Sequence, residues 1–342
     1  MNKIYLTSLF SLFLLFISCD KVLLDEELPN TSKSNFESIW GEFQDKYGLF
    51  QIKGIDWDSV YQVYEPQLEN TSTDAELYAV LVDMLAGLDD SHVALLPTDP
   101  DFPFFQSGIV GQIDEIDDFD LDILKNNYLT DAKFADPFFT YGMLEGEIGY
   151  LHIEGFGDTP RNLEAPMDEV LEALKDAKGI IIDIRGGYGG EDFAGQYIAG
   201  RFTDQLRPYM QTRVKSGPGA KEFTDFEEWS IEPEGDFQYL KPLVVLTHNY
   251  TISARETFGL ALKVLPEVSF VGERTAGAFS NQINREMPNG WGYSLSIGDW
   301  RDAEGVSFEG IGLLPDVEVK NTKSDLLEGK DAVLEKAIEL LQ

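Results

Sequence analysis

Apolar positions recur with a helical period over the first part of the chain. They form three amphipathic stretches, at residues 36–47, 57–68 and 75–88. Within each stretch the apolar residues stand three or four positions apart, which is the spacing of one helix face. Short helices of this kind are stable only when their apolar faces pack together. The pattern therefore predicts a three-helix N-terminal domain over residues 35–95.

The pattern changes near residue 146 to short apolar runs that alternate with helical stretches. Strands that alternate with helices favour an α/β domain with a largely parallel sheet. We expect this domain over residues 146–342, with an irregular insertion at 216–234. The expected strands span 148–153, 179–184, 243–248, 268–271 and 293–297, and the expected helices span 162–175, 192–202, 254–264 and 332–341.

Residues 96–145 show no clear period and are expected to form an irregular connection. Six of the ten residues at 113–122 are Asp or Glu. The run lacks the Asp-x-Asp-x-Asp-Gly spacing, ending in Glu, of a calcium loop. We therefore expect it to be a solvated loop.

The first 34 residues read as a targeting segment and a tether. An apolar stretch from Leu9 to Ile17 follows Lys3 and precedes Ser18 and Cys19. The stretch is shorter than the ~20 residues of a membrane span and resembles a bacterial lipoprotein signal. An ordinary cleaved signal peptide or an uncleaved anchor is the alternative. We expect a signal peptide at 1–18, lipid attachment at Cys19, a tether at 19–34 and an extracytoplasmic, lipid-anchored protein.

Composition excludes several classes of function. Acids outnumber bases 61 to 26, a formal charge of −35, and nucleic-acid binding needs a basic face instead. The folded body is equally unsuited to anionic lipid surfaces, so membrane contact is expected through the lipid only. One cysteine and three scattered histidines provide no zinc-site spacing. We expect no metal and no cofactor.

Four polar segments interrupt the apolar pattern at points where chemistry could occur. Ser91 and His92 follow the third helix, four glycines fill five positions within residues 183–190, Ser253 precedes a helix, and Glu309 lies among glycines. Each segment also has a structural interpretation: a helix C-cap, a tight turn, a capping box and a surface turn. Taken singly, the spacings leave both interpretations open.

Together and in order, these segments resemble the tail-specific or C-terminal processing protease family of serine peptidases, on the side closest to the tricorn core protease. The resemblance covers roughly residues 36–342, including the Asp-x-Arg-Gly-x-x-Gly-Gly turn and residues 251–256. It implies an α/β catalytic domain of the ClpP/crotonase type. The connection between residues 95 and 148 is too short for a PDZ domain, so none is expected.

The resemblance also implies a catalytic tetrad. The lysine of the tail-specific branch would fall at Ala278, whereas Ser91, His92, Ser253 and Glu309 match the tricorn-like set. Ser253 would be the nucleophile and His92 its general base. Ser91 and Glu309 would orient the imidazole.

The same resemblance assigns the remaining groups. Gly189 and Ala254 would donate backbone N–H groups to an oxyanion, and His152 and His248 would be structural. The substrate would be a peptide or unfolded protein, and the acidity favours neutral or basic segments. A non-catalytic protein binding a peptide or an apolar ligand is the alternative, and a serine hydrolase acting on esters is a third possibility. The sequence does not predict the oligomeric state.

Overall fold

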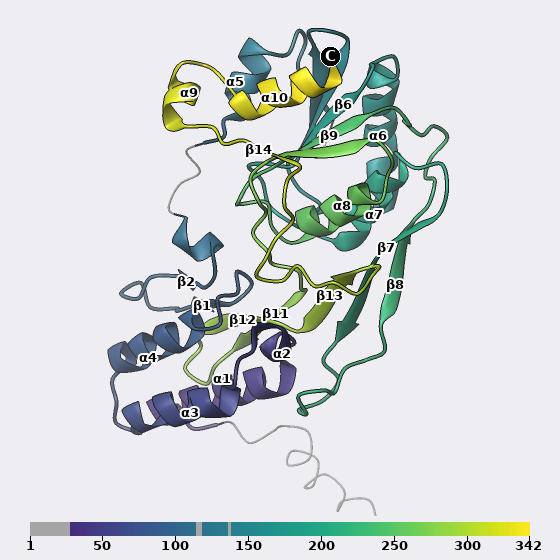
Figure 1. The fold of residues 1–342 in the computed structure, drawn as a ribbon. Helices are drawn as coiled ribbons and strands as arrows, with labels where there is room; N and C mark the ends of the chain where they lie inside the picture. The colour runs from purple at the N-terminus through teal and green to yellow at the C-terminus, as the bar shows by residue number, and fades with distance from the viewer. Residues whose placement is uncertain (1–27, 114–117, 136–137) are drawn as a thin grey trace, which may run out of the picture.

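The computed structural model describes residues 28–342 except 114–117 and 136–137. A helical unit lies at one end of the molecule and a sheet flanked by helices at the other (Figure 1). Within the described residues, no helix is both long and apolar enough to cross a membrane. The expected signal peptide and Cys19 lie outside these residues.

Helices with well-formed N-caps build the N-terminal unit. Thr31, Asp56 and Thr73 each accept a backbone N–H at a helix start, which satisfies donors that the helix itself leaves unpaired. The three expected helical stretches are confirmed. The elements are α1 (Ser32–Lys46), α2 (Phe50–Lys53), α3 (Trp57–Tyr64), the 3₁₀ turn η1 (Glu65–Gln67) and α4 (Asp74–Ala86).

A hairpin from much later in the chain completes the core of this unit. Strands β11 (Gln282–Glu286) and β12 (Gly292–Ser296) join β1 (Ala94–Leu96) and β2 (Phe105–Gln106) in the order β11-β12-β1-β2. Apolar side chains of β12 pack with those of α1 and α4 in one buried cluster. The strand expected at 293–297 therefore exists, but it lies in this sheet and not in the main one.

The main sheet carries the expected α/β fold. Five neighbouring strands are parallel, and two antiparallel strands extend one side. The order is β14-β10-β9-β6-β5-β4-β3. The strands are β3 (Lys133–Ala135), β4 (Phe139–Leu144), β5 (Ile148–Ile153), β6 (Ile180–Asp183), β9 (Leu243–Thr247), β10 (Val268–Gly272) and β14 (Val317–Glu318).

Helices cover both faces of this sheet (Figure 1). Because side chains alternate along a strand, Ile180 and Ile182 pack in one buried cluster and Ile181 in another. The first cluster contains side chains of α6 (Pro160–Leu174), α7 (Asp192–Gly200) and α8 (Ala254–Lys263). The second contains side chains of α5 (Leu121–Asn127) and α10 (Ala332–Leu341). The short helix α9 (Lys323–Leu327) precedes α10.

Two expectations of irregular structure were wrong. Residues 96–145 contain β2, η2 (Val110–Gln112), α5, β3 and β4. Strand β4 is buried almost throughout, so it lacks the alternation of apolar and polar residues that marks a half-exposed strand. The insertion at 216–234 contains β8 (Glu227–Ile231), which forms a sheet with β7 (Arg207–Val214) and β13 (Gly298–Asp302) in the order β13-β7-β8.

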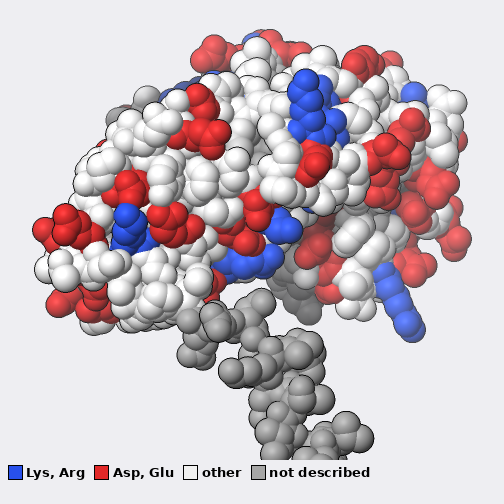
Figure 2. Space-filling view, turned by 90° about the horizontal axis from the view of Figure 1, so that it is seen from below, with Lys and Arg blue, Asp and Glu red and all other residues white. Residues whose placement is uncertain are grey.

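The acidic excess is visible on the surface. Figure 2 shows Asp and Glu side chains spread over the face seen from below, with fewer Lys and Arg among them. One acid of the run at 113–122 behaves differently from the solvated loop that we expected. Asp118 is buried and accepts a hydrogen bond from His248 at 2.9 Å.

Candidate active site

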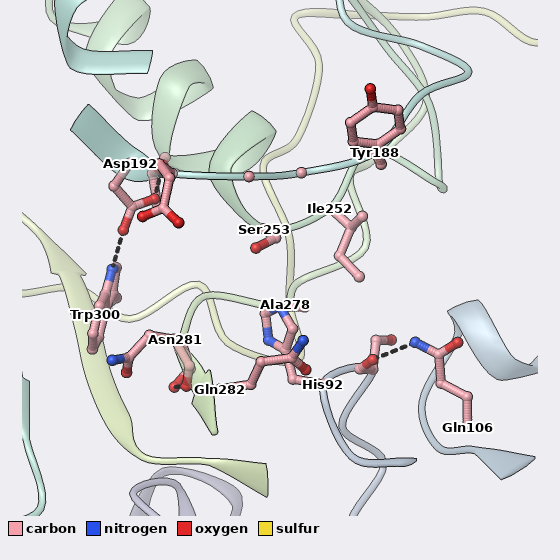
Figure 3. Close-up of a pocket in the computed structure, with 16 residues that line it drawn as sticks. His92, Gln106, Tyr188, Asp192, Ile252, Ser253, Ala278, Asn281, Gln282 and Trp300 are labelled. Carbon is pink, nitrogen blue, oxygen red and sulfur yellow. Dashed lines mark hydrogen bonds between the residues drawn. The ribbon is translucent and has the colours of Figure 1, made fainter. Parts of the chain in front are cut away.

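Three of the four expected catalytic segments meet at a pocket of about 670 Å³ between the helical unit and the main sheet. Ser91 and His92 line it from the turn before β1, Gly189 from the turn after β6, and Ser253 from the start of α8. Figure 3 shows these segments around one hollow. Glu309 and Ala254 were also predicted but do not line the pocket.

Ser253 stands at a strained junction between β9 and α8. Its φ of 62° and ψ of −130° are costly for a residue with a side chain, and such strain collects at functional sites. The capping box expected with Glu256 is present. The Glu256 N–H donates to the Ser253 carbonyl at 2.7 Å, and Glu256 Oε2 accepts the Ser253 N–H at 3.3 Å. Ser253 also lines the pocket, so the helix start and the pocket share this residue.

Glu256 also fixes the opposite wall. It is fully buried and accepts hydrogen bonds from Thr275 Oγ1 at 2.5 Å and from the N–H groups of Gly277 and Ala278 at 2.8 Å. Burial raises its pKa to about 7, against the effect of these donors. Glu256 lies one helical turn after Ser253. It thus holds in place the segment that brings Ala278 to the pocket.

Gly189 lies so close to Ser253 that a larger residue would not fit there without a shift of the backbone. A Cβ added to Gly189 would lie 2.8 Å from Ser253 Cβ, 3.2 Å from its Oγ and 3.4 Å from the Ala254 nitrogen. The Gly189 carbonyl is occupied by the Phe156 N–H at 3.0 Å. Neither the Gly189 nor the Ala254 N–H has an acceptor in the described part of the chain. Two free donors beside one hydroxyl are what an oxyanion hole requires.

Arg255 holds the glycine-rich turn against Ser253. Its buried guanidinium donates to the carbonyls of Ile184 at 2.8 Å, Tyr188 at 2.9 Å and Glu154 at 2.7 Å. Burial lowers its pKa to about 10. Because Arg255 lies two residues after Ser253, one side chain couples the turn to the nucleophile.

A buried ion-pair network supports the start of the same turn. Arg185 contacts Asp183 at 2.8 Å and Asp331 at 3.0 Å, and all three side chains are at most 1% exposed. Burial opposes ionisation of Asp183, but Arg185 holds its pKa below the ordinary value. The Asp-x-Arg-Gly segment therefore has a structural role in addition to its glycines.

His92 is positioned by its own backbone. Its N–H donates to Asp90 Oδ1 at 2.9 Å, and its carbonyl accepts the hydroxyl of Ser294, on β12, at 2.7 Å. The residue is 6% exposed, and its Nδ1 has no partner among the described residues. Burial lowers the pKa of His92, while Asp90 and Asp192 oppose the shift. No hydrogen bond joins His92 to Ser253 in this structure.

The other two members of the predicted tetrad have different surroundings. Ser91 Oγ accepts the Val110 N–H at 3.3 Å. Glu309 is buried, accepts the Phe279 N–H at 2.7 Å and lies 3.2 Å from Lys53 Nζ. Burial and the nearby Asp90 raise its pKa. Glu309 makes no hydrogen bond to His92 or Ser91, so its orienting role stays a prediction.

Sequence reasoning missed part of the pocket wall. Asp192, Thr257 and Trp300 line it, together with Gln106 and Asn281. Gln106, Asn281 and Trp300 come from segments far apart in sequence, so no local motif joins them. Thr257 and Asp192 lie closer to the expected segments, four residues after Ser253 and two residues after Gly190.

His152 and His248 lie outside the pocket lining. His152 Nε2 is 3.0 Å from the Arg185 carbonyl, and His248 pairs with Asp118. These contacts fit the structural roles expected of them. In the described ranges no group of three or more His, Cys, Asp or Glu is arranged to hold a metal ion.

Comparison with known proteins decides the family. The profile of peptidase family S41 matches residues 147–319, and that of the tricorn protease C1 domain matches residues 29–86. The chain belongs to peptidase family S41. The S41 match includes the glycine-rich turn, Ser253 and Glu309, while the tricorn match covers α1 to α4 and ends before Ser91.

The relatives of this S41 chain agree with the expected family and fold. It is 27% identical over 205 residues to the carboxy-terminal processing protease CtpA of Bacillus subtilis, covering 60% of this chain and 41% of the relative. It is also 27% identical over 205 residues to the tricorn protease of Thermoplasma volcanium, covering 59% and 18%. A solved structure of a candidate peptidase from Parabacteroides merdae is 30% identical, with a TM-score of 0.79 and coverage of 92% and 97%. The S41 chain thus spans less than half of these curated relatives but nearly all of the solved structure.

Proposed function

We propose that the protein is a serine endopeptidase that acts through an acyl-enzyme on Ser253. The observation that carries this proposal is the strained Ser253, which lines the pocket beside the free N–H groups of Gly189 and Ala254. A helix cap alone would not need this backbone strain or two unpaired donors. Family membership supports the same chemistry.

The reaction divides into two half-reactions. Ser253 Oγ attacks the peptide carbonyl carbon while His92 takes the hydroxyl proton, and the Gly189 and Ala254 N–H groups stabilise the resulting oxyanion. The tetrahedral intermediate collapses as His92 returns the proton to the leaving amine. Water, activated by the same imidazole, then hydrolyses the ester and releases the carboxylic acid.

His92 and Ser253 must approach each other for this reaction. Catalytic hydrogen bonds are often formed only when substrate is bound, so their absence here is compatible with the assignment. His92 lies on the turn that β12 holds, whereas Ser253 lies on the main sheet domain. We infer that a small relative movement of the two units assembles the pair. Ser91 and Glu309 would then orient the imidazole.

Covalent labelling tests the proposal. The purified protein should react with a fluorophosphonate probe at Ser253, as mapped by mass spectrometry, and Ser253→Ala should not react. His92→Ala should lose most of the labelling although its Ser253 is intact. The rival function is a binding protein for a peptide or an apolar ligand, and it predicts an unlabelled wild type at every pH. An unlabelled, folded wild type would overturn the enzyme assignment.

The pH profile of labelling provides a second prediction. Only neutral imidazole can accept the Ser253 proton, and burial lowers the pKa of His92 below its ordinary 6.5. The labelling rate should therefore rise as the pH increases, with a midpoint below pH 6.5. At higher pH the rate should stay constant. Asp90→Asn should move the midpoint lower still, because the Asp90 carboxylate favours imidazolium. A wild-type midpoint above pH 7 would contradict the role given to His92.

We further propose that Cys19 carries a lipid that anchors the mature protein outside the cytoplasm of a bacterium. The support is the order of Lys3, the apolar stretch and the cysteine in the sequence. The intact mass of the membrane-extracted protein tests it, since lipidation adds a diacylglyceryl group to residue 19. A soluble protein of unmodified mass would refute the anchor.

A further inference from the structure

The pocket around Ser253 is lined by carboxylates and by no fixed positive charge. Its lining includes the carboxylates Glu191 and Asp192 and, among the described residues, no Lys or Arg. His92 does not balance them at neutral pH, because burial lowers its pKa below 6.5. The polar groups around the reacting hydroxyl therefore suit a cation.

Of the carboxylates Glu191 and Asp192, Asp192 is the one held in place by hydrogen bonds. Its Oδ1 accepts the Thr257 hydroxyl at 2.7 Å and its Oδ2 accepts the Trp300 indole N–H at 3.1 Å. Thr257 lies on α8 one turn after Ser253, so the carboxylate is tied to the same helix as the nucleophile. Figure 3 shows Asp192 and Trp300 on one side of the hollow, the side toward which the Ser253 hydroxyl points. Each carboxylate oxygen accepts one hydrogen bond here and retains capacity for another.

Asp192 is partly buried and makes no ion pair in the described chain, and burial raises its pKa above the ordinary value. Asp299 on β13 is instead paired with Arg213 at 2.8 Å and Arg301 at 2.9 Å. The buried Asp90 also makes no ion pair, but its oxygens accept the Tyr47 hydroxyl and the His92 N–H, and it does not line the pocket. A carboxylate withdrawn from water without a cation is costly, and a neutral Asn would serve for packing alone.

We propose that Asp192 is a specificity-determining residue that binds a lysine or arginine side chain of the substrate beside the cleaved bond. The inference rests on the proposed function of Ser253. The bound cation would gain a charge-assisted hydrogen bond in a partly enclosed pocket, which is stronger than a neutral one. Glu191 is exposed and would add only long-range attraction.

Two matched phosphonate probes test this inference. One carries a guanidinophenyl group and the other a plain phenyl group at the side chain next to phosphorus. The wild type should react at least about tenfold faster with the guanidino probe, the effect of one hydrogen bond to a charged group. Asp192→Asn should reduce this ratio to about threefold or less while the phenyl probe reacts at a similar rate. Glu191→Gln, the matched control, should retain most of the preference.

The outcomes separate this inference from the proposed function. Equal wild-type rates with the two probes, or a preference that survives in Asp192→Asn, would overturn the assignment of Asp192 alone. A purely structural role would slow both probes equally and leave the ratio unchanged. If neither probe nor the fluorophosphonate reacts with the wild type, the proposed function itself fails. Thr257→Val, which keeps the charge but removes one anchor of Asp192, should retain part of the preference if Asp192→Asn fails to fold.

Discussion

Gly189→Ala should slow acylation of Ser253 by about 10²–10³-fold, the cost of losing one oxyanion donor. The added methyl would lie 2.8 Å from Ser253 Cβ, closer than non-bonded carbons approach. Because Ser253 is fixed between β9 and α8, the glycine-rich turn has to shift, and the Gly189 N–H moves away from the oxyanion position. The rate of fluorophosphonate labelling, measured at several probe concentrations, checks this expectation.

Gly41→Ala is the matched control for that substitution. It lies on α1, where an added Cβ meets nothing within 4 Å, so labelling should be unchanged. Gly189→Ala should remain folded, as a cooperative thermal unfolding transition would show, although the shift of the turn should lower the unfolding temperature. Unchanged labelling by a folded Gly189→Ala variant would remove Gly189 from the oxyanion hole.

Arg185→Met should destabilise the protein by about 3–5 kcal/mol, because it leaves Asp183 and Asp331 buried without a cation. Both carboxylates must then stay ionised in an apolar environment or take up a proton. Urea unfolding measures the change as a lower midpoint with an unchanged slope. The triple variant with Asp183→Asn and Asp331→Asn should recover part of the loss, because it removes the unpaired charges.

An exposed ion pair serves as the comparison for the loss of stability in Arg185→Met. Arg285 pairs with Glu42 at 2.8 Å, but its side chain is 44% exposed, and such pairs contribute about 1 kcal/mol or less. Arg285→Met should therefore change the midpoint little. Equal losses from Arg185→Met and Arg285→Met would show that the Asp183–Arg185–Asp331 network does not stabilise the turn.

Strands β5, β6, β9 and β10 of the main sheet and the flanking helices α6, α7, α8 and α10 were predictable because their patterns are local. Strand β5 and helix α10 match the expected residues in full, since an apolar run marks the strand and Asp331 caps the start of the helix. Strand β4 was missed because burial on both faces removes the alternation of side chains. The short strand β8 was missed because three of its five residues are charged or hydroxylated.

The pocket was predictable only where one segment supplies several groups. The glycine-rich turn and the Ser253 junction each combine backbone conformation with a reactive or donating atom, so the sequence marks them. Trp300 reaches the pocket from β13, and its relation to Asp192 arises from strand pairing far along the chain. Long-range contacts of this kind have no local signature, and the Lys53–Glu309 pair between the helical unit and the loop that connects β13 to β14 is another example.

The hairpin of β11 and β12 also determines when the site can exist during synthesis. His92 is made early, but the Ser294 hydroxyl that holds its carbonyl is made only after Ser253, and Asp331, which pairs with Arg185, comes later still. A growing chain therefore contains each reactive residue before the contacts that position it. Under the proposed function, the nascent polypeptide would become able to cleave peptides only after β12 and the segment that carries Asp331 have docked.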